Sequence, residues 1–122
     1  MNNRAVLYLR LSKEDIDKFS EGDDSASIKN QRLLLVEYAD KHNLTIVNIY
    51  SDDDESGLYD NRPDFNRMME DAKNGEFDII LAKTQARFSR NMEHIEKYLH
   101  HDLPIWGVRF IGVSDGVDTA DD

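Results

Sequence analysis

Residues 4–12 read Arg-Ala-Val-Leu-Tyr-Leu-Arg-Leu-Ser and form the first apolar segment of the chain. The run at 5–9 is apolar without interruption, which indicates a strand buried on both faces of a parallel sheet. Arg10 and Ser12 follow where this run ends, and because side chains alternate along a strand, both point to the same side. The segment therefore predicts a buried strand at 4–9 that brings a guanidinium and a hydroxyl to one edge of a sheet.

The rest of the chain alternates between strand and helix patterns. Further strands are predicted at 44–50, 77–82 and 105–113. Helices are predicted from Ser25 or Ser27 to about His42, from Pro63 to Asn74-Gly75, and from Met92 to Pro104, which should stop the last one. Loops are predicted at 13–26, 51–61 and 83–91. This alternation implies an α/β fold with a mostly parallel central sheet and helices on both faces.

Helical spacing also predicts which side chains face the core. The inward residues of the first helix are Ile28, Leu34, Leu35, Tyr38 and Ala39, and those of the second are Phe65, Met68, Met69 and Ala72. Met92, Ile95, Tyr98 and Leu99 are expected inward on the third helix, and Trp106 and Phe110 in the last strand. The 39% of residues that are hydrophobic suffice for one core.

Composition limits the class of protein. The 122 residues are enough for one domain, and 33% of them are charged. No apolar run approaches the length of a membrane span and no signal peptide opens the chain, so we expect a cytoplasmic protein with no membrane partner. Zero cysteines exclude disulfides and thiolate metal sites.

Arginines near a serine indicate chemistry on a phosphate. Ser12 offers a hydroxyl nucleophile, and Arg10 offers a fixed cationic fork that suits a phosphate oxyanion. Arg87 and Arg90 are three residues apart, so they share a face in a helical turn. The segments that carry Ser12, Arg62 and Arg87 each follow a predicted strand, and in parallel sheets chemistry collects at that edge. If these groups converge, they are suited to attack on a phosphodiester.

Four blocks of sequence together resemble the catalytic domain of the serine recombinases, the resolvase and invertase family. They are Tyr-Leu-Arg-Leu-Ser at 8–12, Ser-Ile-Lys-Asn-Gln at 27–31, Glu-Ser-Gly-Leu-Tyr-Asp-Asn-Arg-Pro at 55–63, and Lys-Thr-Gln-Ala-Arg-Phe-Ser-Arg-Asn at 83–91. The resemblance runs from about Arg4 to about Val117. The polar loop before the second block and the Lys-Thr-Gln lead into the fourth are similar to the large, transposon-borne branch.

The resemblance implies roles for six residues. Ser12 would attack DNA and form a phosphoserine ester, with Gln31 assisting near the phosphate. The arginines that would hold and stabilise the phosphate are Arg10, Arg62, Arg87 and Arg90. Strand cleavage, exchange between paired sites and religation would need no cofactor, because the ester conserves the bond energy. The family acts on DNA as dimers that pair into tetramers.

Two features depart from a simple DNA enzyme. Many family members have an aspartate where this chain has Ala86, so that role is absent, is taken by another residue or is dispensable. The net charge is −10, although a DNA-binding surface should be basic. We therefore expect 1–122 to be the catalytic domain, inactive alone, with the DNA-binding region beyond Asp122.

Three alternatives stay open. A magnesium-dependent nuclease or primase-like domain could use the acidic run at 52–55, although a solvated acidic loop is the favoured interpretation there and for Asp115 and Asp118. A receiver-like signalling module would need paired acids after the first strand, where this chain has Arg-Leu-Ser. A regulatory domain that kept only the scaffold is the third. The four histidines lack metal-site spacing and are expected on the surface.

Overall fold

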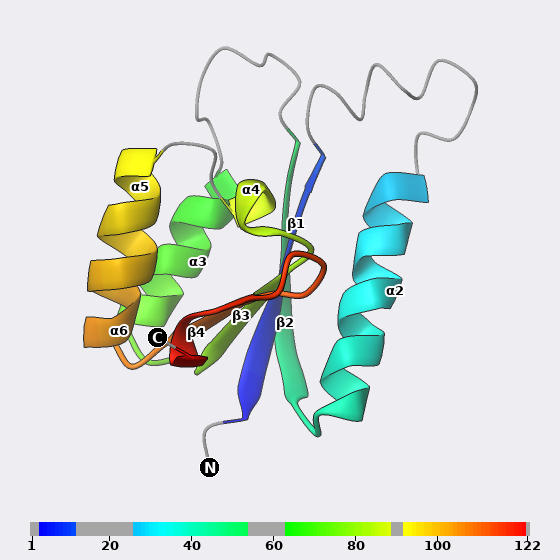
Figure 1. Ribbon diagram of the computed structural model, residues 1–122, viewed down its shortest axis with the longest axis horizontal. Helices are drawn as coiled ribbons and strands as arrows, with labels where there is room; N and C mark the ends of the chain where they lie inside the picture. The colour runs from blue at the N-terminus through cyan, green and yellow to red at the C-terminus, as the bar shows by residue number, and fades with distance from the viewer. Residues whose placement is uncertain (1–2, 12–25, 54–62, 89–91, 122) are drawn as a thin grey trace.

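A computed structural model describes residues 3–11, 26–53, 63–88 and 92–121 (Figure 1). Its centre is a five-stranded sheet in the order β2-β1-β3-β4-β5. The strands are β1 (Arg4–Leu11), β2 (Thr45–Asp53), β3 (Ile79–Ala82), β4 (Arg109–Gly112) and β5 (Val117–Asp118). The first four run parallel, and β5 is antiparallel to β4. The predicted mostly parallel sheet is therefore confirmed.

Helices cover both faces of this sheet. The helix α2 (Ala26–Lys41) lies on one face, and α3 (Pro63–Lys73), α4 (Gln85–Phe88), α5 (Met92–Lys97) and α6 (Leu103–Ile105) lie on the other (Figure 1). The α/β fold class with helices on both faces is confirmed. Of the loop predicted at 13–26, only Ala26 is described, and it belongs to α2.

The strand β1 is the centre of the sheet, as its uninterrupted apolar run predicts. It pairs with β2 along its whole length and with β3 from Ala5 to Leu7. All five residues of the run at 5–9 are at most 2% exposed. Because β1, β2 and β3 are parallel, their carboxyl ends lie at the same edge, which is the upper edge in Figure 1. We call this the carboxyl edge.

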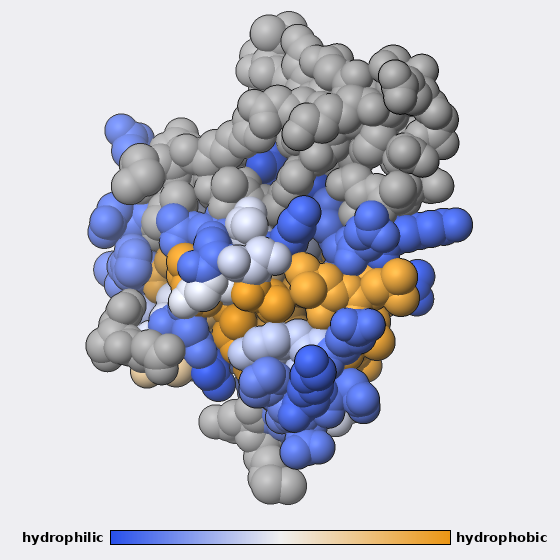
Figure 2. Space-filling view, turned by 45° about the vertical axis from the view of Figure 1, so that its right-hand side comes forward, coloured by the Kyte–Doolittle hydropathy of each residue, from blue (hydrophilic) through white to orange (hydrophobic). Residues whose placement is uncertain are grey.

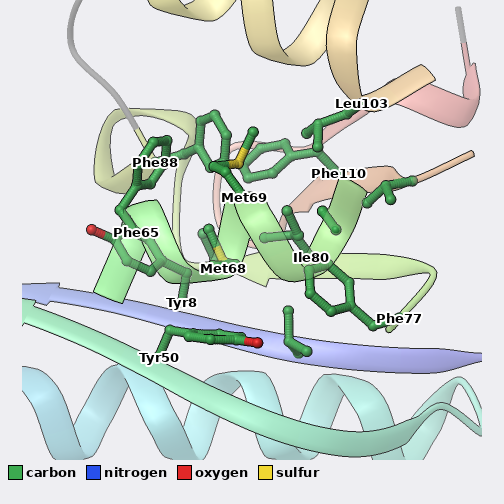
Figure 3. Packing of buried hydrophobic residues seen from close by; sticks show 14 of the residues in the cluster. Tyr8, Tyr50, Phe65, Met68, Met69, Phe77, Ile80, Phe88, Leu103 and Phe110 are labelled. Carbon is green, nitrogen blue, oxygen red and sulfur yellow. The ribbon is translucent and has the colours of Figure 1, made fainter. Parts of the chain in front are cut away.

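Two apolar clusters stabilise the two faces. Between the sheet and α2, the predicted Leu35 and Ala39 pack on Leu7, Leu9 and Ile111. The cluster on the other face is larger and rich in aromatic rings (Figure 3). It contains Tyr8, Tyr50, Phe65, Met68, Met69, Ala72, Phe77, Ile80, Phe88, Leu99, Leu103 and Phe110. The predicted apolar face of α3 is thus confirmed. Trp106, expected in the core, is half-buried against this cluster.

Pro104 does not stop the last long helix, contrary to the prediction. It lies inside α6, and the backbone before it widens into a π-helical turn, η2 (Tyr98–Asp102). There the N–H of Leu103 donates to the carbonyl of Tyr98, five residues earlier. Such widening relieves the clash between a proline ring and the preceding turn, so the chain continues helically through Pro104.

The strand predicted at 105–113 is also wrong in its first part. Ile105 still belongs to α6, and Gly107 has φ 74°, which ends the helix. The N–H of Val108 donates to the carbonyl of Leu103 at 2.8 Å, as in a helix closed by a left-handed glycine. Gly107 is the residue in the sequence that could have indicated where this helix ends. Only residues 109–112 form β4, and the chain then turns back into β5.

The surface on the α2 side is partly apolar. Figure 2 shows a band of apolar residues between polar ones on the face it presents. Half-buried Tyr38, Val113 and Val117 line a hollow between α2 and the last strands, and Leu33 of α2 is 60% exposed.

None of the described helices is long and apolar enough to cross a membrane.

Tyr50 provides a test of this packing. Burial of its ring and its 2.5 Å hydrogen bond to Asp71 raise the pKa of Tyr50 to about 12. Since the unfolded value is about 10, the protonated form stabilises the fold below about pH 10, and this contribution is lost as pH rises toward about 12. Tyr50→Phe should lower the amplitude of the phenolate absorbance change near pH 12 by the contribution of one tyrosine and flatten the alkaline loss of stability.

Tyr38→Phe is the matched control, because it removes one hydroxyl from the opposite face of the sheet. It should leave the absorbance change near pH 12 at its full amplitude. A Tyr50→Phe protein with an undiminished absorbance change near pH 12 would show that Tyr50 is not buried against Asp71 as described.

Candidate active site

The six residues predicted for the site are described to different extents. Arg10 and Gln31 are described with their side chains, and Arg87 by its backbone within α4. The predictions for Ser12, Arg62 and Arg90 fall outside the described residues. The site can therefore be built from Arg10, from Gln31 and from the backbone that carries Arg87.

Arg10 lies on β1 at the carboxyl edge and is 6% exposed. Alternation along the strand puts it on the same face as Val6 and Tyr8, which belong to the large aromatic cluster. Burial of a guanidinium is costly unless it is paired. The structure thus places a buried guanidinium at the carboxyl end of the central strand.

Gln31 fixes the backbone of Arg10. Its Oε1 accepts the N–H of Arg10 at 3.3 Å, and its Nε2 donates to the carbonyl of Arg10 at 3.1 Å. Pairing between β1 and β3 ends at Leu7, so the amide of Gln31 acts at Arg10 much as a neighbouring strand would. Gln31 is 1% exposed, which excludes a solvated surface glutamine. Its predicted contact with the phosphate stays a prediction.

Asp52 is a site residue that the sequence analysis missed. It is 6% exposed, although the acidic run at 52–55 was interpreted as a solvated loop, and β2 continues to Asp53 into the loop predicted at 51–61. Its Oδ2 accepts the Tyr8 hydroxyl at 2.8 Å and the N–H of Phe65 at 2.8 Å. Its Oδ1 accepts the N–H of Asp64 at 3.0 Å. Asp52 thus caps the first turn of α3 from a neighbouring strand.

The position of Asp52 beside Arg10 follows from strand register. Asp52 pairs with Arg10 across β1 and β2, just as Tyr50 pairs with Tyr8. Tyr50 is buried and apolar, so alternation from Tyr50 to Asp52 was the signal that could have shown the acid facing inward. The carboxyl edge therefore holds a buried acid on the strand next to a buried arginine.

The helix α4 corrects the loop predicted at 83–91. Residues 85–88 form one helical turn that packs beside β1 and β3. Phe88 is fully buried, and its ring lies 5.0 Å from the rings of both Phe65 and Phe110 (Figure 3). Arg87 immediately precedes this anchor, so the backbone that carries it is held beside the strand that carries Arg10.

Metal ligands are not grouped in the described part of the chain. No cluster of three or more His, Cys, Asp or Glu side chains there could hold a metal ion. Both oxygens of Asp52 already accept hydrogen bonds from the protein. His42, His100 and His101 are exposed as predicted, whereas the side chain of His94 lies outside the described residues.

Comparisons with known proteins identify the family and the fold. The chain matches the family model of the resolvase N-terminal domain over residues 5–122. A resolvase family site-specific recombinase from Streptococcus pneumoniae is 31% identical, with a TM-score of 0.80, and the match covers 98% of this chain and 77% of that chain. The N-terminal catalytic domain of TP901-1 integrase is 24% identical, with a TM-score of 0.78 over 96% of this chain and 82% of that chain.

A third solved structure is the C-terminal catalytic domain of ISC1926 TnpA, an IS607-like serine recombinase. It is 24% identical, with a TM-score of 0.68, and the match covers 88% of this chain and 67% of that chain. The curated proteins contain no match. The family match covers the residues of all four sequence blocks, and α4, within the fourth block, packs beside β1, which carries the described part of the first. On these grounds the chain belongs to the resolvase family of serine recombinases and has the fold of their catalytic domain.

Proposed function

We propose that this domain cleaves and rejoins DNA strands as the catalytic domain of a site-specific recombinase, with Ser12 as the nucleophile. The observation that carries the proposal is the packing of α4 against β1. It brings the helix that contains Arg87 to the strand that contains Arg10. Ser12 comes two residues after Arg10 in the sequence.

The reaction conserves bonds and needs no oxidant or nucleotide. The Ser12 oxygen forms a bond to phosphorus and loses its proton, while the bond from phosphorus to one deoxyribose oxygen breaks and that oxygen gains a proton. The product is a phosphoserine ester on one DNA end and a free hydroxyl on the other. Attack on the ester by a hydroxyl from a partner strand restores a phosphodiester and frees Ser12.

The arginines supply charge rather than proton transfer. Arg10, Arg87 and Arg90 bind the phosphate oxygens and stabilise the charge that builds in the transition state. Arg62, which immediately precedes α3, adds a further contact to the phosphate. Gln31 keeps Arg10 in place through its backbone. Such prepared donors cost no reorganisation when the reaction occurs.

The magnesium-dependent alternative has less support. Of the acidic run at 52–55, the described carboxylate of Asp52 faces inward and is engaged by Tyr8 and by the N–H groups at the start of α3. Those contacts fix its orientation toward α3. They account for Asp52 as a structural acid without a metal ion.

The partners of the domain follow from the reaction. Exchange between two duplexes requires cleavage of four strands, and each Ser12 can hold one strand, so the active assembly is a tetramer formed from two dimers. The net charge of −10 opposes binding to a polyanion. The surface that supplies most of the DNA affinity therefore lies outside residues 1–122.

The first test traps the covalent intermediate. The recombinase that carries this domain is incubated with a nicked duplex containing its recombination site, which lets one product diffuse away and leaves the ester. We expect one DNA strand to become linked to Ser12, as seen by a mobility shift and by mass spectrometry of the modified peptide. Ser12→Ala should form no adduct because the attacking oxygen is gone.

The same assay with a metal chelator distinguishes the serine mechanism from the magnesium-dependent nuclease. Adduct formation should continue after metal removal. Loss of cleavage with a chelator, rescue by magnesium and activity in Ser12→Ala would together favour the nuclease and overturn the proposal.

Gln31 gives a second prediction. Gln31→Ala leaves the buried N–H and carbonyl of Arg10 without the amide, which should cost about 1–3 kcal/mol of unfolding free energy. The rate of adduct formation per folded molecule should fall as well, because Arg10 is less well placed. Denaturant unfolding and the trapping assay measure the two effects. Asn30→Ala, an exposed neighbour on α2, is the control and should change neither.

The third prediction concerns affinity. Residues 1–122 alone should bind duplex DNA no tighter than roughly 10⁻⁴ M at physiological salt, because few phosphates are neutralised. Titration of a labelled duplex measures this. Sub-micromolar, sequence-selective binding would place a DNA-reading surface within the domain and contradict the division of labour proposed above.

A further inference from the structure

The turn between β4 and β5 holds the start of α4. Asp115, in that turn, accepts the N–H of Gln85 on Oδ2 at 2.8 Å and the N–H of Val117 on Oδ1 at 3.4 Å. Gln85 is the first residue of α4, and the first N–H groups of a helix have no partner within it. A carboxylate thirty residues away in the chain therefore supplies the acceptor. Asp115 is exposed, but it is not the unattached surface acid that its sequence suggested.

Backbone hydrogen bonds join the same two segments. The N–H of Val113 donates to the carbonyl of Ala82 at 3.0 Å, and the N–H of Ser114 donates to the carbonyl of Lys83 at 2.8 Å. These bonds continue the pairing of β3 with β4 beyond Ala82 and Gly112. Asp115 completes the series by bonding to Gln85 through its side chain.

Gly112 leaves the space that Asp115 occupies. A Cβ at Gly112 would lie 2.3 Å from Oδ1 of Asp115 and 3.3 Å from the nitrogen of Gln85. Its φ is not among the positive values, which in the described chain belong to Asn43, Gly75, Gly107 and Gly116. A Cβ at 112 would therefore displace the Asp115 carboxylate, so glycine serves there for room and not for backbone conformation.

The turn that carries Asp115 is itself anchored. Arg109 of β4 donates from Nε and Nη2 to the two carboxylate oxygens of Asp118 in β5. These hydrogen bonds hold the pKa of Asp118 below its usual range. The Thr119 hydroxyl accepts the N–H of Phe110 at 3.0 Å. The turn that carries Asp115 is thus held in place on both sides by hydrogen bonds between β4 and the residues that follow the turn.

A helix of four residues cannot keep its place alone. Its last residue, Phe88, is fixed in the aromatic cluster, and its first N–H is fixed by Asp115. Arg87 lies between these two anchors. Loss of either anchor would let the backbone of Arg87 turn or shift.

We infer that Asp115 is a positioning residue for the reaction: it fixes the start of α4 so that Arg87 meets the scissile phosphate, without touching DNA itself. The inference rests on the proposed function. It goes further by assigning a role to the β4–β5 turn, which carries none of the residues predicted to react.

The experiment is a double-mutant cycle in the trapping assay at saturating DNA. Asp115→Ala should lower the rate of adduct formation about ten- to a hundredfold, as small misplacements near a reacting centre do, with unchanged DNA affinity. Asp115→Asn should recover most of the rate, because its amide oxygen can still accept the N–H of Gln85. Ser114→Ala, an exposed side chain in the same turn, is the control and should react normally.

Gly112→Ala tests the contact without removing the acid. It should slow the reaction by displacing the Asp115 carboxylate, and the double variant Gly112→Ala/Asp115→Ala should be no slower than Asp115→Ala, because the clash is gone. Amide hydrogen exchange of the 122-residue chain provides a readout independent of DNA. The N–H of Gln85 should be protected in the wild type and in Asp115→Asn, and exposed in Asp115→Ala.

The outcomes are distinguishable. A wild-type protein that forms no Ser12-dependent adduct overturns the proposed function, and the inference with it. A Ser12-dependent adduct in the wild type together with an undiminished rate in Asp115→Ala overturns the inference alone. Strict additivity of Gly112→Ala and Asp115→Ala also contradicts it, because the two changes would then act separately.

Discussion

The buried carboxylate of Asp52 is the contact on which the carboxyl edge depends. From one position on β2 it accepts the Tyr8 hydroxyl of β1 and two N–H groups at the start of α3. A buried carboxyl group is tolerated there because three donors replace water and the positive end of the helix lies nearby. Without it, the buried N–H of Phe65, the partly buried N–H of Asp64 and the Tyr8 hydroxyl would lose this acceptor. One side chain therefore links β1, β2 and α3 at this edge.

Polar side chains support this edge in the same manner at three places. Gln31 bonds to the backbone of Arg10, Asp52 to the first turn of α3, and Asp115 to the first N–H of α4. Each bond fixes the backbone of a segment that carries or follows a predicted arginine. A hydrogen bond to the backbone fixes both the position of a residue and the direction in which its side chain leaves the chain. A residue can therefore be oriented by groups that never approach the phosphate. Arginine side chains need such support because their own rotamers are many.

The sequence predicted those parts of the fold that depend on local burial. The apolar run at 5–9 and the spacing of Phe65, Met68 and Met69 show β1 and α3 directly, since hydrophobic periodicity is visible within one element. Asp52 was misinterpreted because its donors Tyr8 and Phe65 are 44 and 13 residues away. The single turn of α4 is too short to show a period. The helical path through Pro104 depends on a π-helical turn that no local pattern indicates.

The acidic composition and a phosphate site are compatible because they act over different distances. Charges on an exposed surface are screened beyond about 8 Å at physiological salt, so the net charge of −10 affects mainly the approach of a long polyanion. A guanidinium about 4 Å from a phosphate interacts with roughly 4 kcal/mol near a protein surface. Arg10 is 6% exposed, where screening by salt is weaker still. The proposed phosphate site at the carboxyl edge is therefore compatible with an outer surface that contributes little to binding of the duplex.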